Sequence, residues 1–172
     1  MKPIIKSLVF SALAIFVTSC ECEGTIEKSL AGKWEYTIEI SFKGTNNTDP
    51  SVSETKKFSG TFTWDETLDG YLEGDLGDSY SYLDGFITDD YLDSDGEYYL
   101  AFYADTFHWS ENGKQYEAFC DWKSVPVRYN MKSFKTTPIN WIGSPWVEII
   151  RPDGSEVFCL AVEATLEARK IR

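Results

Sequence analysis

Residues 34–43 read WEYTIEISFK, a run in which large apolar side chains alternate strictly with polar or charged ones. Successive side chains of a β-strand point to opposite faces, so this period of two predicts a strand with one buried and one solvated face. Such strands are typical of antiparallel sheets. Residues 58–64 repeat the pattern, with Phe58, Gly60, Phe62 and Trp64 on one face. Two half-buried antiparallel strands are therefore expected near the start of the fold.

Asn112-Gly113 is the strongest hairpin signal in the chain. A two-residue type I′ turn needs positive φ at both central positions, which asparagine and glycine tolerate. If these two residues form the turn, Glu111 lies opposite Lys114 and Trp109 lies opposite Tyr116. An opposite-charge pair and an aromatic pair then fall into register, and both stabilise a hairpin.

A second hairpin signal, Pro152-Asp153-Gly154, precedes a long last strand. In that strand an alternating apolar set is expected to share one face: Phe158, Leu160, Val162, Ala164, Leu166 and Ala168. Counting all such runs gives about eight to ten strands at the spacing of a barrel or a sandwich. No internal repeat interrupts them, so the sequence predicts one all-β, antiparallel domain.

The charge of the chain excludes one class of partner. The 172 residues include 16 Lys and Arg against 28 Asp and Glu, which gives a formal net charge of −12. A strongly acidic surface repels phosphate backbones, so we expect no nucleic-acid partner. Aromatic residues make up 16% of the chain, a share that favours a sheet-rich fold.

The N-terminus has the features of an export signal. In residues 1–19, Lys2 and Lys6 precede a mostly apolar run, 8–17, that is too short to span a bilayer stably. The following Val17-Thr18-Ser19-Cys20 resembles the lipobox of bacterial lipoproteins, whose cysteine is diacylated and becomes the first residue after cleavage. The resemblance implies a signal peptide 1–19, lipidation of Cys20, a tether 20–29 and a single folded domain 30–172. The alternative is an ordinary secreted protein that is cleaved nearby.

The same resemblance implies a location and a partner. The membrane would be bound through the diacylglyceryl-cysteine at residue 20, because two or three acyl chains anchor stably. Residue 21 is Glu rather than Asp, which by similarity to enteric sorting rules favours the outer membrane. We therefore expect an outer-membrane lipoprotein of the cell envelope, facing either the periplasm or the cell surface.

A second resemblance concerns the barrel. Leu30-Ala31-Gly32-Lys33-Trp34, directly before the first strand, is similar to the Gly-x-Trp signature of lipocalins. In that family the tryptophan closes the base of an eight-stranded up-and-down barrel, and an arginine of the last strand stacks on it. The resemblance implies that Trp34 and Arg169 take these roles and that the barrel is up-and-down. A β-sandwich is the alternative fold.

The aromatic residues suggest two kinds of binding. If Trp34, Trp64, Phe102, Trp109 and Trp122 point inward, they can line a cavity for a small apolar ligand. Aromatic side chains that lie outside can instead stack on sugar rings of a glycan; the candidates are Trp122, if it does not point inward, and Trp141, Trp146, Tyr80, Tyr82, Tyr98 and Tyr99. The third alternative is a structural or interaction module with a filled interior.

The sequence offers little for catalysis. His108 is the only histidine, and no nucleophile motif accompanies it, so we expect a protein that is not an enzyme. No Cys or His spacing suits a metal, and no cofactor is expected. Cys120 and Cys159 each fall in a strand-like run, either as a disulfide or as two buried thiols.

Overall fold

The computed structural model describes residues 23–77, 81–89, 98–102, 105–139 and 145–172. Cys20 and the predicted signal peptide lie outside these residues, as do Tyr80 and Trp141. The elements are α1 (Glu23–Leu30), β1 (Gly32–Gly44), β2 (Ser53–Trp64), β3 (Leu72–Gly74), β4 (Gly85–Asp89), β5 (Tyr98–Phe102), β6 (Asp105–Glu111), β7 (Lys114–Cys120), β8 (Val125–Val127), β9 (Ser133–Thr136), β10 (Trp146–Ile150) and β11 (Glu156–Lys170).

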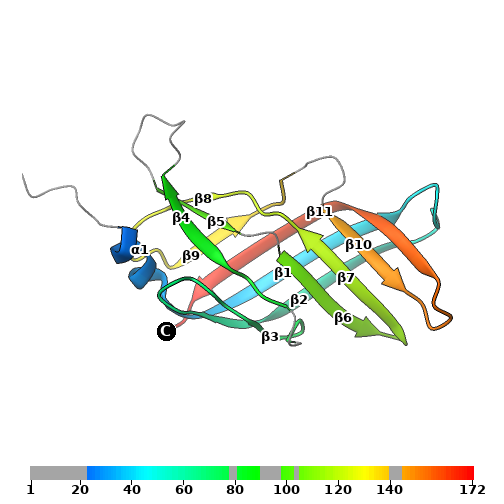
Figure 1. Ribbon diagram of the computed structural model, residues 1–172, viewed down its shortest axis with the longest axis horizontal. Helices are drawn as coiled ribbons and strands as arrows, with labels where there is room; N and C mark the ends of the chain where they lie inside the picture. Colours follow the sequence, from blue (N-terminus) through cyan, green and yellow to red (C-terminus); the bar gives the residue numbers. More distant parts are fainter. Residues whose placement is uncertain (1–22, 78–80, 90–97, 103–104, 140–144) are drawn as a thin grey trace, which may run out of the picture.

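The strands form one large curled sheet and one small sheet, and all pairs are antiparallel (Figure 1). The large sheet runs in the order β3-β2-β1-β11-β10-β7-β6 and curls into a half-barrel. One edge of β11 pairs with β1, while its other edge pairs first with β10 and then with β9. The small sheet, β4-β5-β8, lies towards the α1 end of the molecule (Figure 1). The predicted all-β, barrel-like fold is confirmed.

The connectivity departs from a simple up-and-down barrel. The described part of the chain holds eleven strands rather than eight to ten, because several are only three to five residues long. Strand β10 lies between β7 and β11, so the chain between β7 and β10 leaves the large sheet to form β8 and returns as β9 on the far part of β11. Strands β3 and β6 end the sheet order, and no ladder joins them among the described residues.

The first strand and the first hairpin signal are confirmed. In β1 the apolar side chains of the alternating run, from Trp34 to Phe42, are all buried. Asn112 and Gly113 have φ of 52° and 76°, as a type I′ turn requires. The turn sets Trp109 opposite Tyr116, and their rings stack with centroids 4.8 Å apart.

The expected single face of the last strand is wrong. Ala164, Leu166 and Ala168 point inward, but Phe158, Leu160 and Val162 are exposed on the outer face, Val162 by 72%. The pairing with β1 slips by one residue at Ser41/Phe42, which leaves Val162 as the extra residue of a β-bulge. Because side chains alternate with a period of two, one extra residue exchanges the faces on either side of it.

The last part of the predicted tether packs against the folded domain. Residues 23–30 form helix α1 instead of the last part of a tether, and Ile26 and Leu30 are buried in the core. The Ser29 hydroxyl accepts a hydrogen bond from the backbone N–H of Asn130, which ties the helix to the turn between β8 and β9. Helix α1 is therefore part of the folded domain.

Candidate functional site

The α1 end of the half-barrel is filled by aromatic rings. Trp34 is fully buried and lies 6.2 Å from Phe62, 5.4 Å from Trp64 and 5.7 Å from Phe134, measured between ring centroids. Phe102 adds a further ring, 5.5 Å from Phe134. Three of the predicted cavity residues, Trp34, Trp64 and Phe102, thus meet in one cluster, where each ring packs against other rings.

The indole N–H groups of this cluster are satisfied by backbone carbonyls. Trp34 Nε1 donates to the carbonyl of Leu30 at 2.8 Å, and Trp64 Nε1 donates to that of Leu83 at 2.7 Å. The first bond joins the start of β1 to the end of α1. Trp34 is therefore buried at this end of the half-barrel and hydrogen-bonded to the last residue of α1.

Arg169 does not stack on Trp34, so that prediction is wrong. Arg169 lies opposite Glu35, one residue away from the register position of Trp34, and adjacent residues of a strand face opposite sides. Its side chain is 69% exposed and forms an ion pair with Glu35 on the outer face. The cation at the barrel end is instead Lys170, whose Nζ donates to the carbonyls of Ser29 at 2.8 Å and Ala31 at 2.5 Å.

The other predicted residues are dispersed. Trp122 is buried beside Phe107, with ring centroids 6.4 Å apart, and Trp109 lies on β6. Cys120 and Cys159 are buried thiols, on β7 and β11. Strand β10 lies between those strands, so the lateral separation is about 9.5 Å at the usual strand spacing, beyond the reach of a disulfide. Burial raises the pKa of the Cys159 thiol to about 11.

A groove lies where the two edges of the curled sheet approach each other. It has a volume of about 480 Å³, within the range of small-molecule sites. Its lining comes from the end of β3 with the following turn, and from β6 and β7: Gly74, Asp75, Leu76, Gly77, His108, Trp109, Ser110, Gln115 and Tyr116. We call this hollow the seam groove.

The seam groove has an aromatic wall. Trp109 stacks on Tyr116 with an angle of 11° between the ring planes, and Phe58 packs on Trp109 at a centroid distance of 4.8 Å. Lys56 Nζ lies 5.6 Å from the centre of the Tyr116 ring and is held there by ion pairs with Glu54 and Glu111. A rigid wall of this kind suits the flat or apolar face of a ligand.

One polar atom of this wall has no partner. Trp109 Nε1 is buried, and no acceptor among the described residues takes its hydrogen bond. A buried indole N–H normally finds an acceptor, because leaving it unpaired costs about 1–3 kcal/mol. The neighbouring phenol of Tyr36 stays neutral, since burial raises its pKa to about 12 and the charge of Asp75 adds to the shift.

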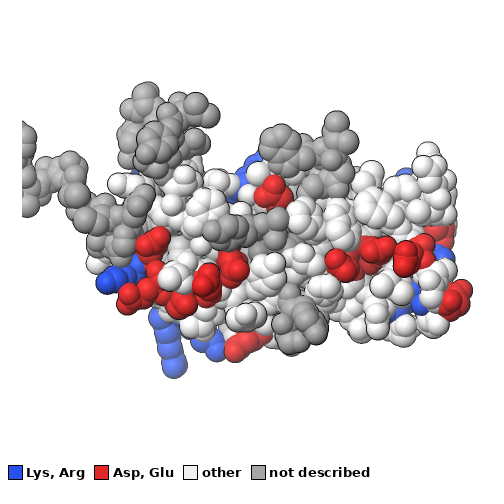
Figure 2. All heavy atoms as spheres, in the orientation of Figure 1, with Lys and Arg blue, Asp and Glu red and all other residues white. Residues whose placement is uncertain are grey.

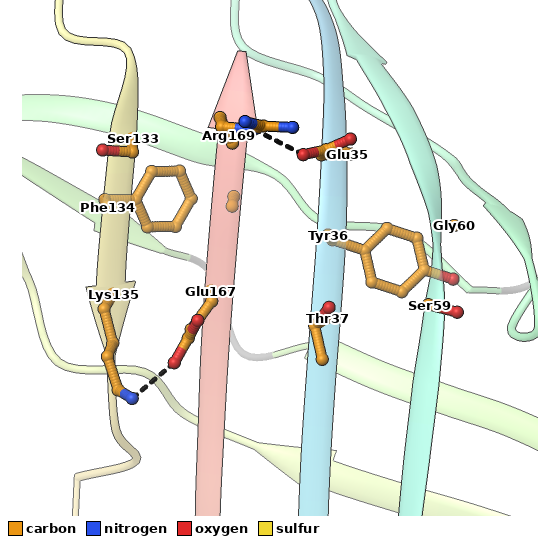
Figure 3. Close-up of a pocket in the computed structure, with 11 residues that line it drawn as sticks. Glu35, Tyr36, Thr37, Ser59, Gly60, Ser133, Phe134, Lys135, Glu167 and Arg169 are labelled. Atoms are coloured by element: carbon orange, nitrogen blue, oxygen red, sulfur yellow. Dashed lines mark hydrogen bonds and ion pairs between the residues drawn. The ribbon is translucent and has the colours of Figure 1, made fainter. Parts of the chain in front are cut away.

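A second hollow, of about 720 Å³, is open on the outer face of β2, β1, β11 and β9. Two ion pairs cross it, Glu35 with Arg169 and Lys135 with Glu167 (Figure 3). All four side chains are at least 43% exposed, so water already solvates these charges. The seam groove is the candidate site because the stacked rings of Trp109 and Tyr116 form its wall, whereas exposed ion pairs cross the outer hollow.

No model of a known protein family matches the chain, and no curated protein matches it. The resemblance to lipocalins consequently rests on the short sequence motifs alone.

Further features constrain the chemistry of the described part. Within it, no group of three or more His, Cys, Asp or Glu side chains is placed to hold a metal ion. No helix there is long and apolar enough to cross a membrane.

Sequence reasoning missed most of the groove. It named Trp109 and paired Tyr116 with it through the hairpin, but Asp75 and Leu76 come from a turn far away in the chain. No local sequence pattern predicts that β3 and β6 lie close together, because their proximity depends on how the whole sheet curls.

Proposed function

We propose that this protein is a lipid-anchored lipoprotein of the cell envelope that binds a small ligand in the seam groove without changing it chemically. The ligand is largely apolar, with a flat face that packs on Trp109 and Tyr116 and an acceptor atom for the Trp109 N–H. The observation that carries this proposal is a groove of suitable volume whose lining includes the stacked rings of Trp109 and Tyr116; the buried Nε1 of Trp109 has no acceptor among the described residues.

The location of the groove supports binding over a filled module. The α1 end holds a dense ring cluster, whereas the seam combines a rigid aromatic wall with polar groups at its rim, among them Ser110 and Gln115. Small-molecule sites commonly combine an apolar lining with a few placed polar groups.

Anchoring at Cys20 is supported by the lipobox resemblance. The chain from Cys20 to Glu23, the first residue of α1, spans at most about 11 Å when fully extended. A lipidated Cys20 would therefore hold the domain against the membrane surface, with α1 at the near end.

Native mass spectrometry of the protein, purified gently from its own envelope fraction, tests ligand binding. We expect a stoichiometric extra mass that disappears after organic extraction. Trp109→Phe keeps a ring in the stack but removes the N–H, and should lower ligand occupancy strongly. Trp122→Phe is the matched control, because its Nε1 is also buried without an acceptor among the described residues but does not line the groove. A bare mass for the parent protein, or equal occupancy in both variants, would refute the proposed site.

Metabolic labelling with palmitate tests the anchor separately. Cys20→Ser should abolish incorporation of the label, whereas Cys22→Ser should retain it. Label that persists in Cys20→Ser would show that the predicted lipidation site is mistaken.

A further inference from the structure

Strands β7, β10 and β11 carry a contiguous apolar surface on the outer face of the sheet. It consists of Phe119, Trp146, Phe158, Leu160 and Val162, and we call it the outer patch. Phe158 is 37% exposed, Leu160 47% and Val162 72%, while Phe119 and Trp146 are half-buried. Isolated exposed apolar side chains are ordinary, but a joined set across three strands marks an interaction surface.

The aromatic members of the outer patch touch one another. Trp146 lies directly opposite Phe119 on one side and Leu160 on the other. Its ring is 6.0 Å from that of Phe119 and 5.8 Å from that of Phe158, measured between centroids. Mutual packing holds these side chains in place, so a partner would meet a preformed surface.

A row of carboxylates lies next to the outer patch. Glu117 is directly opposite Glu148, and Glu156 is on the adjacent strand β11, facing Ile150. Like charges directly opposite each other destabilise a sheet. None of the three forms an ion pair with a cationic group of the described residues. Figure 2 shows red side chains in a row over β7 and β10 on this face.

This charge decides which occupant fits. An anionic membrane surface would be repelled by the three glutamates. A second copy of the chain carries the same net charge of −12, and a symmetric contact centred on the patch would bring six of these carboxylates into one interface. Lys43 lies opposite Leu160, on the side of the patch away from the glutamates.

We propose that the outer patch and its three glutamates bind a basic, partly apolar segment of a protein partner. Trp146 and Glu148 are two residues apart on one strand and on the same face, about 7 Å along the strand. An arginine or lysine stem can therefore lie across the Trp146 ring while its head pairs with Glu148. Apolar side chains of the same segment would cover Leu160 and Val162. None of the residues of the outer patch and none of the three glutamates lines the seam groove, so the proposal does not depend on a ligand there.

Fluorescence anisotropy with a labelled heptapeptide of alternating arginine and leucine tests the proposal on the full chain in a nonionic detergent. We expect saturable binding that Trp146→Ala weakens about tenfold and Glu148→Gln about fivefold, in line with the loss of a cation–π contact and of a charge-assisted bond. Glu39→Gln is the matched control: it removes one outer-face carboxylate on β1, away from the patch, and should leave the affinity unchanged.

Several results would overturn the proposal. Equal weakening by Glu39→Gln and Glu148→Gln would mean that the peptide responds only to the overall charge of the protein. The same conclusion would follow if a control peptide of lysine and glycine, with the same charge, bound as tightly as the arginine and leucine peptide. Binding of maltoheptaose that is lost in Trp146→Ala but kept in Glu148→Gln would assign the surface to a glycan. Tighter binding to anionic than to neutral vesicles through Trp146 would assign it to a membrane. Glu148→Gln keeps the side-chain shape and removes a repulsion, so loss of fold cannot explain its effect. A cooperative thermal transition well above the assay temperature in each variant verifies that all of them are folded.

Discussion

Replacing Trp34 by alanine measures how far the stability of the domain depends on the ring cluster at the α1 end. The side chain is fully buried among three rings and donates to the carbonyl of Leu30. A buried tryptophan removes about 200 Å² from water, which corresponds to about 5 kcal/mol at 25 cal/mol per Å². Measured losses for large aromatic truncations in cores are about 3–5 kcal/mol. We therefore expect a loss of about 4 kcal/mol, a large part of the total for a domain of this size.

Urea titration followed by circular dichroism measures this loss. With a slope near 2 kcal/mol per M, a loss of 4 kcal/mol moves the midpoint by about 2 M. Trp34→Phe keeps a ring but loses the N–H, so its free energy of unfolding should lie between those of the parent and of Trp34→Ala. Trp146→Ala on the outer face should cost about 1 kcal/mol or less. A loss below about 1 kcal/mol for Trp34→Ala would refute the closing role, because that lies well under the core range.

Three further predictions concern Lys170 at the barrel end, the two buried thiols, and Glu148 in the row of carboxylates. Lys170→Met should cost about 2 kcal/mol in a thermal melt, because it removes charged bonds to two carbonyls at the end of α1, whereas the exposed Arg169→Ala should cost less than about 1 kcal/mol. With the two N-terminal cysteines replaced by serine, Cys120 and Cys159 should resist a thiol reagent at pH 8 and both react in urea without reductant; no reactive thiol in urea before reduction, and two after it, would indicate a bond between them. Burial and the neighbouring glutamates raise the pKa of Glu148 above 4.5, so the folded state binds this proton more readily and the group favours folding increasingly as the pH falls through its folded pKa towards 4.5. Glu148→Gln should consequently exceed the parent in stability most at neutral pH and lose that advantage on acidification; a constant difference in melting temperature would contradict this assignment.

Local patterns predicted the parts of the fold that local forces control. The alternation over residues 34–43 fixed which face of β1 is buried, because apolar side chains of a strand share a face only at a period of two. Asn112-Gly113 fixed both the turn and the register of its hairpin, since two residues with positive φ leave one way to pair the strands.

The errors arose where one residue changes the register. The apolar alternation of the last strand continues from Phe158 to Ala168, and nothing in it marks Val162 as the extra residue. The bulge depends on how β11 must bend to pair with β1 along its whole length. The same one-residue difference separates Arg169, which faces solvent, from Lys170, which crosses the barrel end. A motif-based expectation cannot resolve such a shift, because both residues are basic.

The candidate site shows the same division. The sequence by itself determined an all-β chain, a predicted export and lipidation signal, an acidic surface and a hairpin that pairs Trp109 with Tyr116. Only the tertiary structure decided that the rings near Trp34 fill the barrel end and that the turn holding Asp75 lies beside β6 to form the seam groove. The physical reason is range: alternation and turn chemistry act over a few residues, whereas the curl of the sheet, its bulge and the meeting of its two edges depend on packing between segments far apart in the chain.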